Sequence, residues 1–424
     1  MERVDLDKYF LQNTFALSLS EFLWGIGIPV ILESNFVTVF LTYLGATNFQ
    51  IGLSSFIFSF SMAIVPFFSA YLTSNMIYKK KANILTQYIP SVSVILLGIN
   101  FLFFYKDKLG YEIFLFYFFL FSVGLASTGP LWQNYITKIF TPSKALKGIS
   151  IMMFFQNTGK IIGGFLLALV LIYLPLNVKN SGLIFLITGI LFFLGSTCFV
   201  FTKENPDDIK SLKRENFLKY YLTFLKKFFQ NKNLIFYVIQ DIEFIIVIVA
   251  ITFYSRYAIE WGGISPAQVS GAFVIIAFVG AIVANFLLGF IEKVNLKLRY
   301  FLIKLSSIIS LLFLIFSTNL VVFYIVSFFL GFSRAGRIHL YIPVVKKLTG
   351  CNDASPYYAL LPFIMLPVSS FFPVIAGLFL DKFGFMGGNA YKYLFIFMFL
   401  LVCLSIIPFM KVDFDRSIDN NSHI

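Results

Sequence analysis

Long apolar runs alternate with short polar connections along almost the entire chain. A helix that crosses a bilayer needs about 20 mainly apolar residues, and twelve runs approach or exceed that length. The predicted segments are residues 13–42, 49–73, 82–105, 111–139, 147–174, 181–202, 233–258, 267–291, 300–318, 320–345, 355–380 and 390–410. The first segment is longer than one crossing requires and contains Pro29, so we expect a tilted or kinked helix there.

One long polar connection, residues 203–232, divides these segments into two sets of six. Its second half alternates aromatic and basic residues, which is typical of an amphipathic helix lying on anionic lipid. The pattern predicts an N-terminal six-helix half at 1–202, a cytoplasmic basic amphipathic linker at 203–232, and a C-terminal six-helix half at 233–424 with a short cytoplasmic tail.

The basic residues predict how the helices are oriented. With the N-terminus inside, 23 lysines and arginines fall in inner connections and six in outer ones. Lysine and arginine accumulate in cytoplasmic loops of membrane proteins. We therefore expect a multi-pass protein of the cell inner (plasma) membrane with both termini in the cytoplasm.

Composition supports the membrane class and excludes others. The chain is 59% hydrophobic and 12% charged, against roughly 25% charged residues in soluble domains. Its net charge of +13 reflects the basic inner loops, so we expect no nucleic-acid partner. The expected partners are the lipid bilayer and a small-molecule solute, and we expect the protein to be a monomer. Three cysteines do not imply a disulfide framework, and the first ten residues lack the apolar core of a cleaved signal peptide.

Short matches between the two halves indicate an internal repeat. Residues 45–51 align with 263–269, and Gly124 and Gly129 align with Gly331 and Gly336. Occurring in order, these matches indicate two copies of one unit. The expected fold class is therefore an all-α polytopic membrane protein whose twelve helices form two pseudo-symmetric six-helix bundles.

In helix count, central basic loop, cytoplasmic termini and two-fold repeat, the chain resembles the major facilitator superfamily over essentially its whole length. That family's signature between helices two and three is G-x-x-x-D-(R/K)-x-G-x-(R/K). Residues 70–81 keep only the basic end, whereas 288–299 keep an acid and two bases, so the subfamily stays unresolved. Residues 159–164 resemble the G-P-x-x-G-G ending of the antiporter motif, with Lys160 in place of proline.

Ionisable side chains at bilayer depth cost roughly 2.5–3.5 kcal/mol each, so they persist where they are paired, solvated or used. The resemblance implies that helices one, four, seven and ten line a central cavity. The candidate substrate-binding residues are Glu21, Trp24, Trp132, Gln133, Asn134, Gln156, Asn157, Lys160, Gln240, Glu243, Arg334, Arg337 and Tyr341. The candidates for ion coupling are Glu21, Asp241, Glu243 and His339.

The charged candidates could have a functional or a purely structural role. Arg334 and Arg337 share one stripe of helix ten without an acid on that helix, and paired guanidiniums suit a carboxylate or phosphate. Glu21 and Lys160 could instead form a permanent pair. Asp241 is expected to snorkel or to pair with the central linker. His339 could support proton coupling or only donate a hydrogen bond.

The sequence contains none of the enzyme motifs that we considered. The chain has two histidines and lacks the G-x-x-x-x-G-K-(S/T), H-E-x-x-H and G-x-S-x-G patterns. We therefore expect no enzyme activity, no cofactor and no metal. The favoured function is a secondary membrane transporter that moves a small polar or anionic solute by alternating access, as an ion-coupled symporter or as a uniporter. The alternatives are a proton-coupled exporter of drugs or amphipathic compounds, and a non-transporting membrane receptor or channel.

Overall fold

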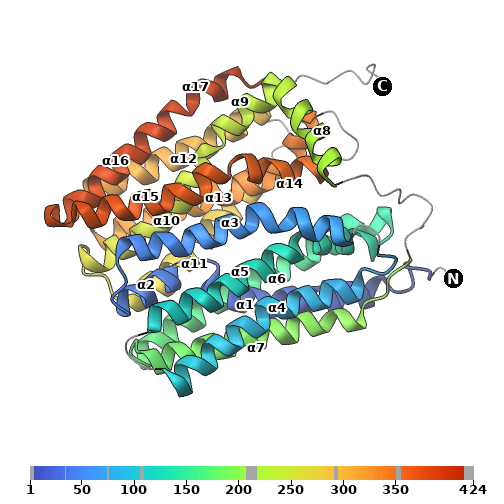
Figure 1. Ribbon diagram of the computed structural model, residues 1–424, viewed down its shortest axis with the longest axis horizontal. Coiled ribbons are helices and arrows are strands. Elements are labelled where there is room, and N and C mark those ends of the chain that lie inside the picture. Colours follow the sequence, from blue (N-terminus) through green and yellow to red (C-terminus); the bar gives the residue numbers. More distant parts are fainter. Residues whose placement is uncertain are drawn as a thin grey trace. The chain divides into compact units, whose positions relative to one another are not determined.

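The computed structural model describes residues 4–33, 35–73, 76–105, 109–206, 217–290, 295–349 and 355–414. All regular structure in these ranges is helical (Figure 1). The chain forms two compact units. Unit 1 comprises residues 1–46, 57–214 and 266–272, and unit 2 comprises residues 47–56, 215–265 and 273–424.

Unit 1 contains the helices of the predicted N-terminal half, except for the start of α3. They are α1 (Phe10–Ile31), α2 (Asn35–Tyr43), α3 (Asn48–Thr73), α4 (Lys80–Ile99) with the π-turn η1 (Asn100–Phe104), α5 (Gly110–Lys138), α6 (Pro142–Tyr173), and α7 (Val178–Cys198) with η2 (Phe199–Phe201). The π-turn η4 (Gln268–Ala272), which begins the eighth predicted segment, also belongs to this unit.

Unit 2 contains the linker helix and most of the second half. Its helices are α8 (Phe217–Gln230), α9 (Lys232–Gln240), α10 (Ile242–Glu260), α11 (Phe273–Phe290), α12 (Leu296–Phe316), α13 (Leu320–Thr349), α14 (Ser355–Ile364), α15 (Leu366–Lys382), η5 (Gly384–Met386), α16 (Gly388–Leu404) and α17 (Ile406–Lys411).

All twelve predicted segments are helical, and the structure divides four of them into two helices. Among the described residues, eleven helices are long and apolar enough to cross a membrane. The segment predicted at 355–380 is instead two shorter helices, α14 and α15, separated at Met365. The first predicted segment is also two helices, because α1 ends at Ile31 and α2 starts at Asn35.

The twelfth predicted segment is divided as well, since α16 ends at Leu404 and α17 begins at Ile406. The seventh predicted segment was also expected to be one continuous helix. α9 ends at Gln240 and α10 begins at Ile242, with Asp241 in a turn between them. At this turn the Phe244 amide donates to the Asp241 carbonyl at 3.0 Å, three residues back, and no longer to the carbonyl of Gln240. The Gln240 carbonyl is therefore available to another donor.

The same packing recurs in the two units. α4 packs on α5 and α7 in unit 1, and α12 packs on α13 and α16 in unit 2. Gly45 and Gly263, which the sequence repeat aligns, both have positive φ, at 79° and 63°. Few residues other than glycine adopt this conformation readily. The repeat therefore preserves a turn geometry as well as a residue type.

A reciprocal hydrogen-bond pair also recurs in the two units. The Asn13 amide donates to the Lys203 carbonyl at 3.1 Å and accepts from the Lys203 amide at 2.7 Å. The Asn233 amide donates to the Asp413 carbonyl at 2.7 Å and accepts from the Asp413 amide at 2.9 Å. The first pair ties α1 to the segment after η2, and the second pair ties α9 to the segment after α17.

Candidate functional site

In unit 1, a buried carboxylate is held by two neutral donors. Glu21 on α1 is 6% exposed. Its Oε1 accepts from the Trp132 indole of α5 at 2.9 Å, and its Oε2 accepts from the Gln156 amide of α6 at 2.6 Å. Lys160 lies one turn further along α6, close enough for its charge to act on this carboxyl group. Four of the predicted site residues therefore gather at one place.

Glycines bring α1 and α6 close enough to form this cluster. A Cβ added to Gly25 would lie 2.4 Å from the Gln156 carbonyl oxygen, and one added to Gly163 would lie 2.1 Å from the Ile26 carbonyl oxygen. Such distances are shorter than any side chain tolerates, so only glycine allows the two backbones to approach in this way. The segment that resembles the antiporter motif thus packs α6 against α1 and places Gln156 beside Glu21.

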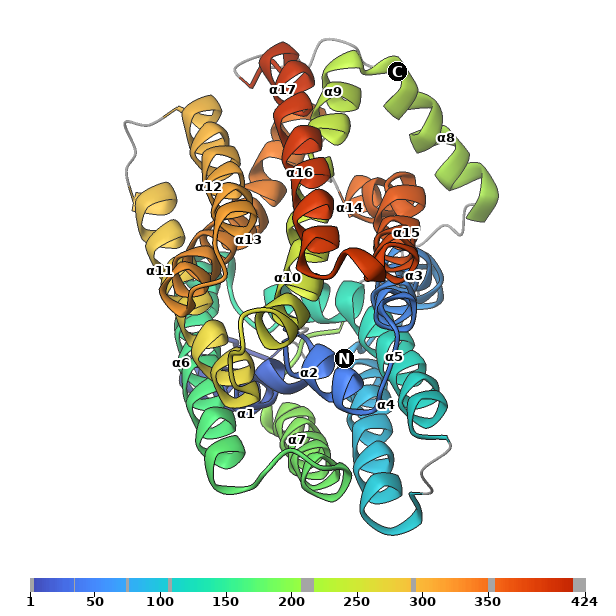
Figure 2. The ribbon, with the colours of Figure 1, turned by 90° about the vertical axis from the view of Figure 1, so that its left-hand side faces the viewer.

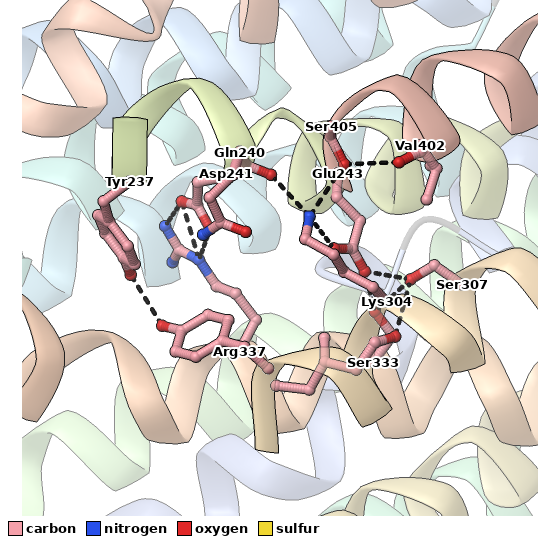
Figure 3. Close-up of polar contacts among 12 residues, drawn as sticks. Tyr237, Gln240, Asp241, Glu243, Lys304, Ser307, Ser333, Arg337, Val402 and Ser405 are labelled. Atoms are coloured by element: carbon pink, nitrogen blue, oxygen red, sulfur yellow. Dashed lines mark hydrogen bonds and ion pairs between the residues drawn. The ribbon is translucent and has the colours of Figure 1, made fainter. Parts of the chain in front are cut away.

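In unit 2, Arg337 of α13 forms an ion pair with Asp241 at the break between α9 and α10 (Figure 3). Nε of Arg337 donates to the two carboxylate oxygens at 3.1 and 3.2 Å, and Nη2 also donates to Oδ2. The guanidinium carbon lies 4.1 Å from the ring centroids of both Phe244 and Tyr341. The expected pairing of Asp241 with the central linker was wrong, because the break turns its carboxylate toward α13.

Lys304 of α12 occupies the other side of the break (Figure 3). Its ammonium donates to the Gln240 carbonyl at 3.0 Å, to Oε2 of Glu243 at 2.8 Å and to Oγ of Ser405 at 2.9 Å. These contacts use all three ammonium protons. Lys304 therefore caps the end of α9 and holds the first turn of α10 in place.

The remaining oxygen of Glu243 is bound by hydroxyl groups. Ser307 donates to Oε1 at 2.6 Å, and Ser333 lies 3.5 Å from the same oxygen. The Lys304 and Glu243 side chains are 0% and 6% exposed. A buried ion pair is stable only when its remaining hydrogen-bonding capacity is satisfied, as it is here. This arrangement gives Glu243 a structural role at the break.

A pocket of about 10 Å³, the space that one water molecule needs, lies at the break. Its lining residues are Gln240, Asp241, Glu243, Phe244, Tyr300, Ile303, Ser333 and Arg337. Nε2 of Gln240 and the Tyr341 hydroxyl are buried without a hydrogen-bond partner among the described residues. An unsatisfied buried polar group costs about 1–3 kcal/mol, so each of these two groups favours a hydrogen-bonding partner such as a water molecule.

The other sequence candidates lie elsewhere. The Trp24 indole donates to Ser196 at 3.3 Å and stacks on Phe192, so it packs α1 on α7. Gln133 and His339 are exposed, and Asn157 and Arg334 are half-buried. The side chain of Asn134 lies outside the described part of the chain.

The sequence pattern did not single out Lys304 or Asp381. Lys304 is a lysine inside an apolar segment, which is a signal for a buried partner. Asp381 lies in residues 377–384, which match the first eight positions of the family signature expected between helices two and three. Within unit 2 its carboxylate accepts from the Asn48 and Phe49 amides at 2.8 and 2.7 Å, capping the start of α3.

Comparison with known proteins identifies the family. The family model described as Major Facilitator Superfamily matches residues 13–338. The chain therefore belongs to the major facilitator superfamily, whose members are membrane transporters and in general not enzymes. No curated protein sequence matches the chain.

Solved structures agree on the fold. A structure of a variant of the nucleoside transporter NupG has a TM-score of 0.71 at 13% identity, covering 95% of this chain and 99% of that one. A structure of a proton dependent oligopeptide transporter has a TM-score of 0.71 at 14% identity, covering 96% and 99%. A bacterial homologue of the human lysosomal transporter Spinster has a TM-score of 0.63 at 13% identity, covering 96% of both chains. At sequence identities this low, the structural likeness establishes a shared fold and nothing more specific.

Proposed function

We propose that this transporter moves a small anionic solute by alternating access and that Arg337 binds the anionic group. The observation that supports this proposal is the set of unused donors around that guanidinium. Asp241 takes Nε and Nη2, so Nη1 has no hydrogen-bond partner among the described residues. The Gln240 side-chain amide and the Tyr341 hydroxyl beside it likewise have no hydrogen-bond partner in the described part of the chain. A planar guanidinium with two neutral donors suits a carboxylate or phosphate.

We further propose that Asp241 couples transport to a proton. In the structure its carboxylate occupies the Nε–Nη2 edge of Arg337, next to the Nη1 donor that we propose for the solute. A proton on Asp241 would weaken the ion pair and free that edge, so proton binding and anion binding would favour each other. Glu21 is the second candidate, because it is buried among hydrogen-bond donors in unit 1. Lys304 already neutralises Glu243, which argues against a coupling role for that residue.

A thermal-shift screen of the purified protein tests the solute class. A ligand at 100 times its dissociation constant stabilises the folded state by about 2.7 kcal/mol. We expect small carboxylates or phosphate esters to raise the thermal midpoint of the wild type but not of Arg337→Gln. Stabilisation by amphipathic cations alone would replace this proposal with that of a drug exporter acting through Glu21.

We also propose the inner membrane as the location, a monomer as the transporting unit, and cytoplasmic termini. A cysteine introduced at position 215, in the linker, should react with an impermeant maleimide only after the cells are opened. A cysteine at Asn177, between α6 and α7, is the control and should react in intact cells. Labelling of position 215 from outside intact cells would contradict the orientation.

A further inference from the structure

The linker helix α8 docks on unit 2 through only part of its apolar surface. The Phe224 ring contacts the Tyr357 ring of α14 edge-on, with centroids 5.4 Å apart. Phe228, four residues later on the same face, is 2% exposed. Figure 2 shows α8 at the margin of unit 2, beside α9 and α14. These two phenylalanines therefore attach the helix to the unit.

A second apolar stripe on α8 is not covered by the described residues. Leu222 and Phe229 are 61% and 64% exposed. They are seven residues apart and share one face, about a third of a turn from the face that carries Phe224 and Phe228. Two large exposed apolar side chains in register require an apolar environment other than the described part of this unit.

Lysines border this exposed stripe. Lys219 and Lys226 are exposed and are also seven residues apart, so they share one face of the helix. This face adjoins the Leu222–Phe229 stripe on the side away from Phe224 and Phe228. Lys227 lies nearer the docked face, with Nζ 5.8 Å from the Phe224 ring centroid. Residues 217–230 contain no acid. Around its circumference, α8 thus presents a docked face, an exposed apolar stripe and a row of positive charge.

The position of α8 along the chain places it at a membrane surface. Asn231 joins it to α9, and the span that begins at Lys232 is 29 residues long. The Asn231 amide donates to the Leu348 carbonyl at 2.9 Å, next to the last turn of α13 with its own lysines, Lys346 and Lys347. The start of a transmembrane span lies at the headgroup level, so α8 and these lysines lie there too.

We propose that α8 is a binding surface for anionic phospholipid. Leu222 and Phe229 enter the boundary between headgroups and acyl chains, and Lys219 and Lys226 bind the phosphates above them. Because Phe224 contacts Tyr357 of α14, a lipid contact of α8 also acts on α14. This surface is independent of the solute site.

Spin-label accessibility in vesicles tests the proposal. The full chain, with its native cysteines replaced by serine, would carry a nitroxide at Phe229→Cys. It would be reconstituted in phosphatidylcholine alone or with roughly one quarter phosphatidylglycerol, an anionic content that attracts basic segments. We expect oxygen to reach position 229 more readily than a water-soluble nickel chelate, and the preference to be several-fold stronger with phosphatidylglycerol. Thr223→Cys, on the polar face, is the matched control and should favour nickel in both vesicles.

Replacing the two lysines gives a second test of the proposal. In a Lys219→Gln, Lys226→Gln background, the response of position 229 to phosphatidylglycerol should disappear while insertion into phosphatidylcholine persists. Equal insertion in the two vesicles with the lysines intact would overturn the anionic preference. Nickel accessibility at position 229 equal to that at 223 would overturn the membrane contact itself.

Discussion

Replacing Lys304 with methionine should lower the free energy of unfolding by about 3–5 kcal/mol, because removing one partner of a buried ion pair leaves the other charge uncompensated. The Glu243 carboxylate would lose its ionic partner and keep the hydroxyl contact with Ser307. The Gln240 carbonyl at the helix break would lose its donor as well. The apparent thermal midpoint in detergent should fall accordingly.

A double variant separates loss of charge balance from loss of packing. Lys304→Met combined with Glu243→Gln removes both charges at similar volume, and replacements of whole buried pairs are often nearly neutral. We therefore expect the double variant to regain most of the lost stability. Lys144→Met, in the exposed pair with Asp7, is the control and should show no measurable change. A single Lys304→Met variant as stable as the wild type would contradict the role of Lys304 at the break.

Arg337→Lys should weaken binding of the anionic solute roughly tenfold or more, since a lost charge-assisted hydrogen bond is worth about 1.5–3 kcal/mol. An ammonium cannot present two parallel donors or lie flat between the rings of Phe244 and Tyr341. The measurement is the concentration dependence of the thermal shift and of uptake. Arg256→Lys is the matched control, because Arg256 pairs with Glu260 outside the site, and it should behave like the wild type.

Asp241→Asn distinguishes a binding role from a structural one. If Asp241 competes with the solute for Arg337, its neutralisation should leave anion affinity equal or higher while abolishing proton-driven accumulation. If the pair only supports the fold, Asp241→Asn and Arg337→Gln should each lower the thermal midpoint, and the double variant should restore it. That second pattern, with unchanged solute affinity, would remove Arg337 from the binding site.

The positions of the helices could be predicted from the sequence because a bilayer demands long apolar segments whose backbone groups bond within the segment. Hydropathy therefore located every segment, including 355–380, which is broken at Met365. It did not locate the break at Asp241, because apolar stretches continue before Gln240 and after Glu243. A side chain from another helix, Lys304, satisfies the freed carbonyl.

The sequence allowed prediction of which charged residues are buried more readily than of which residues they pair with. Buried charge singled out Glu21, Asp241 and Arg337, since each is costly at bilayer depth. Their partners come from other helices, and helical periodicity places residues on a face without specifying the neighbouring helix. The aspartate was for this reason expected to snorkel or to pair with the linker, whereas the structure pairs it with α13. The tight α1–α6 contact at Gly163 likewise depends on three-dimensional packing.

Uptake into proteoliposomes tests most directly whether this chain is an ion-coupled transporter. The solute found in the thermal-shift screen would be supplied outside vesicles with an imposed inward proton gradient. We expect saturable uptake that exceeds the outside concentration, collapses with a protonophore and is strongly reduced in Arg337→Lys. Linear, non-saturating flux would indicate a channel, and binding without flux would indicate a receptor. Either result would contradict the proposed function.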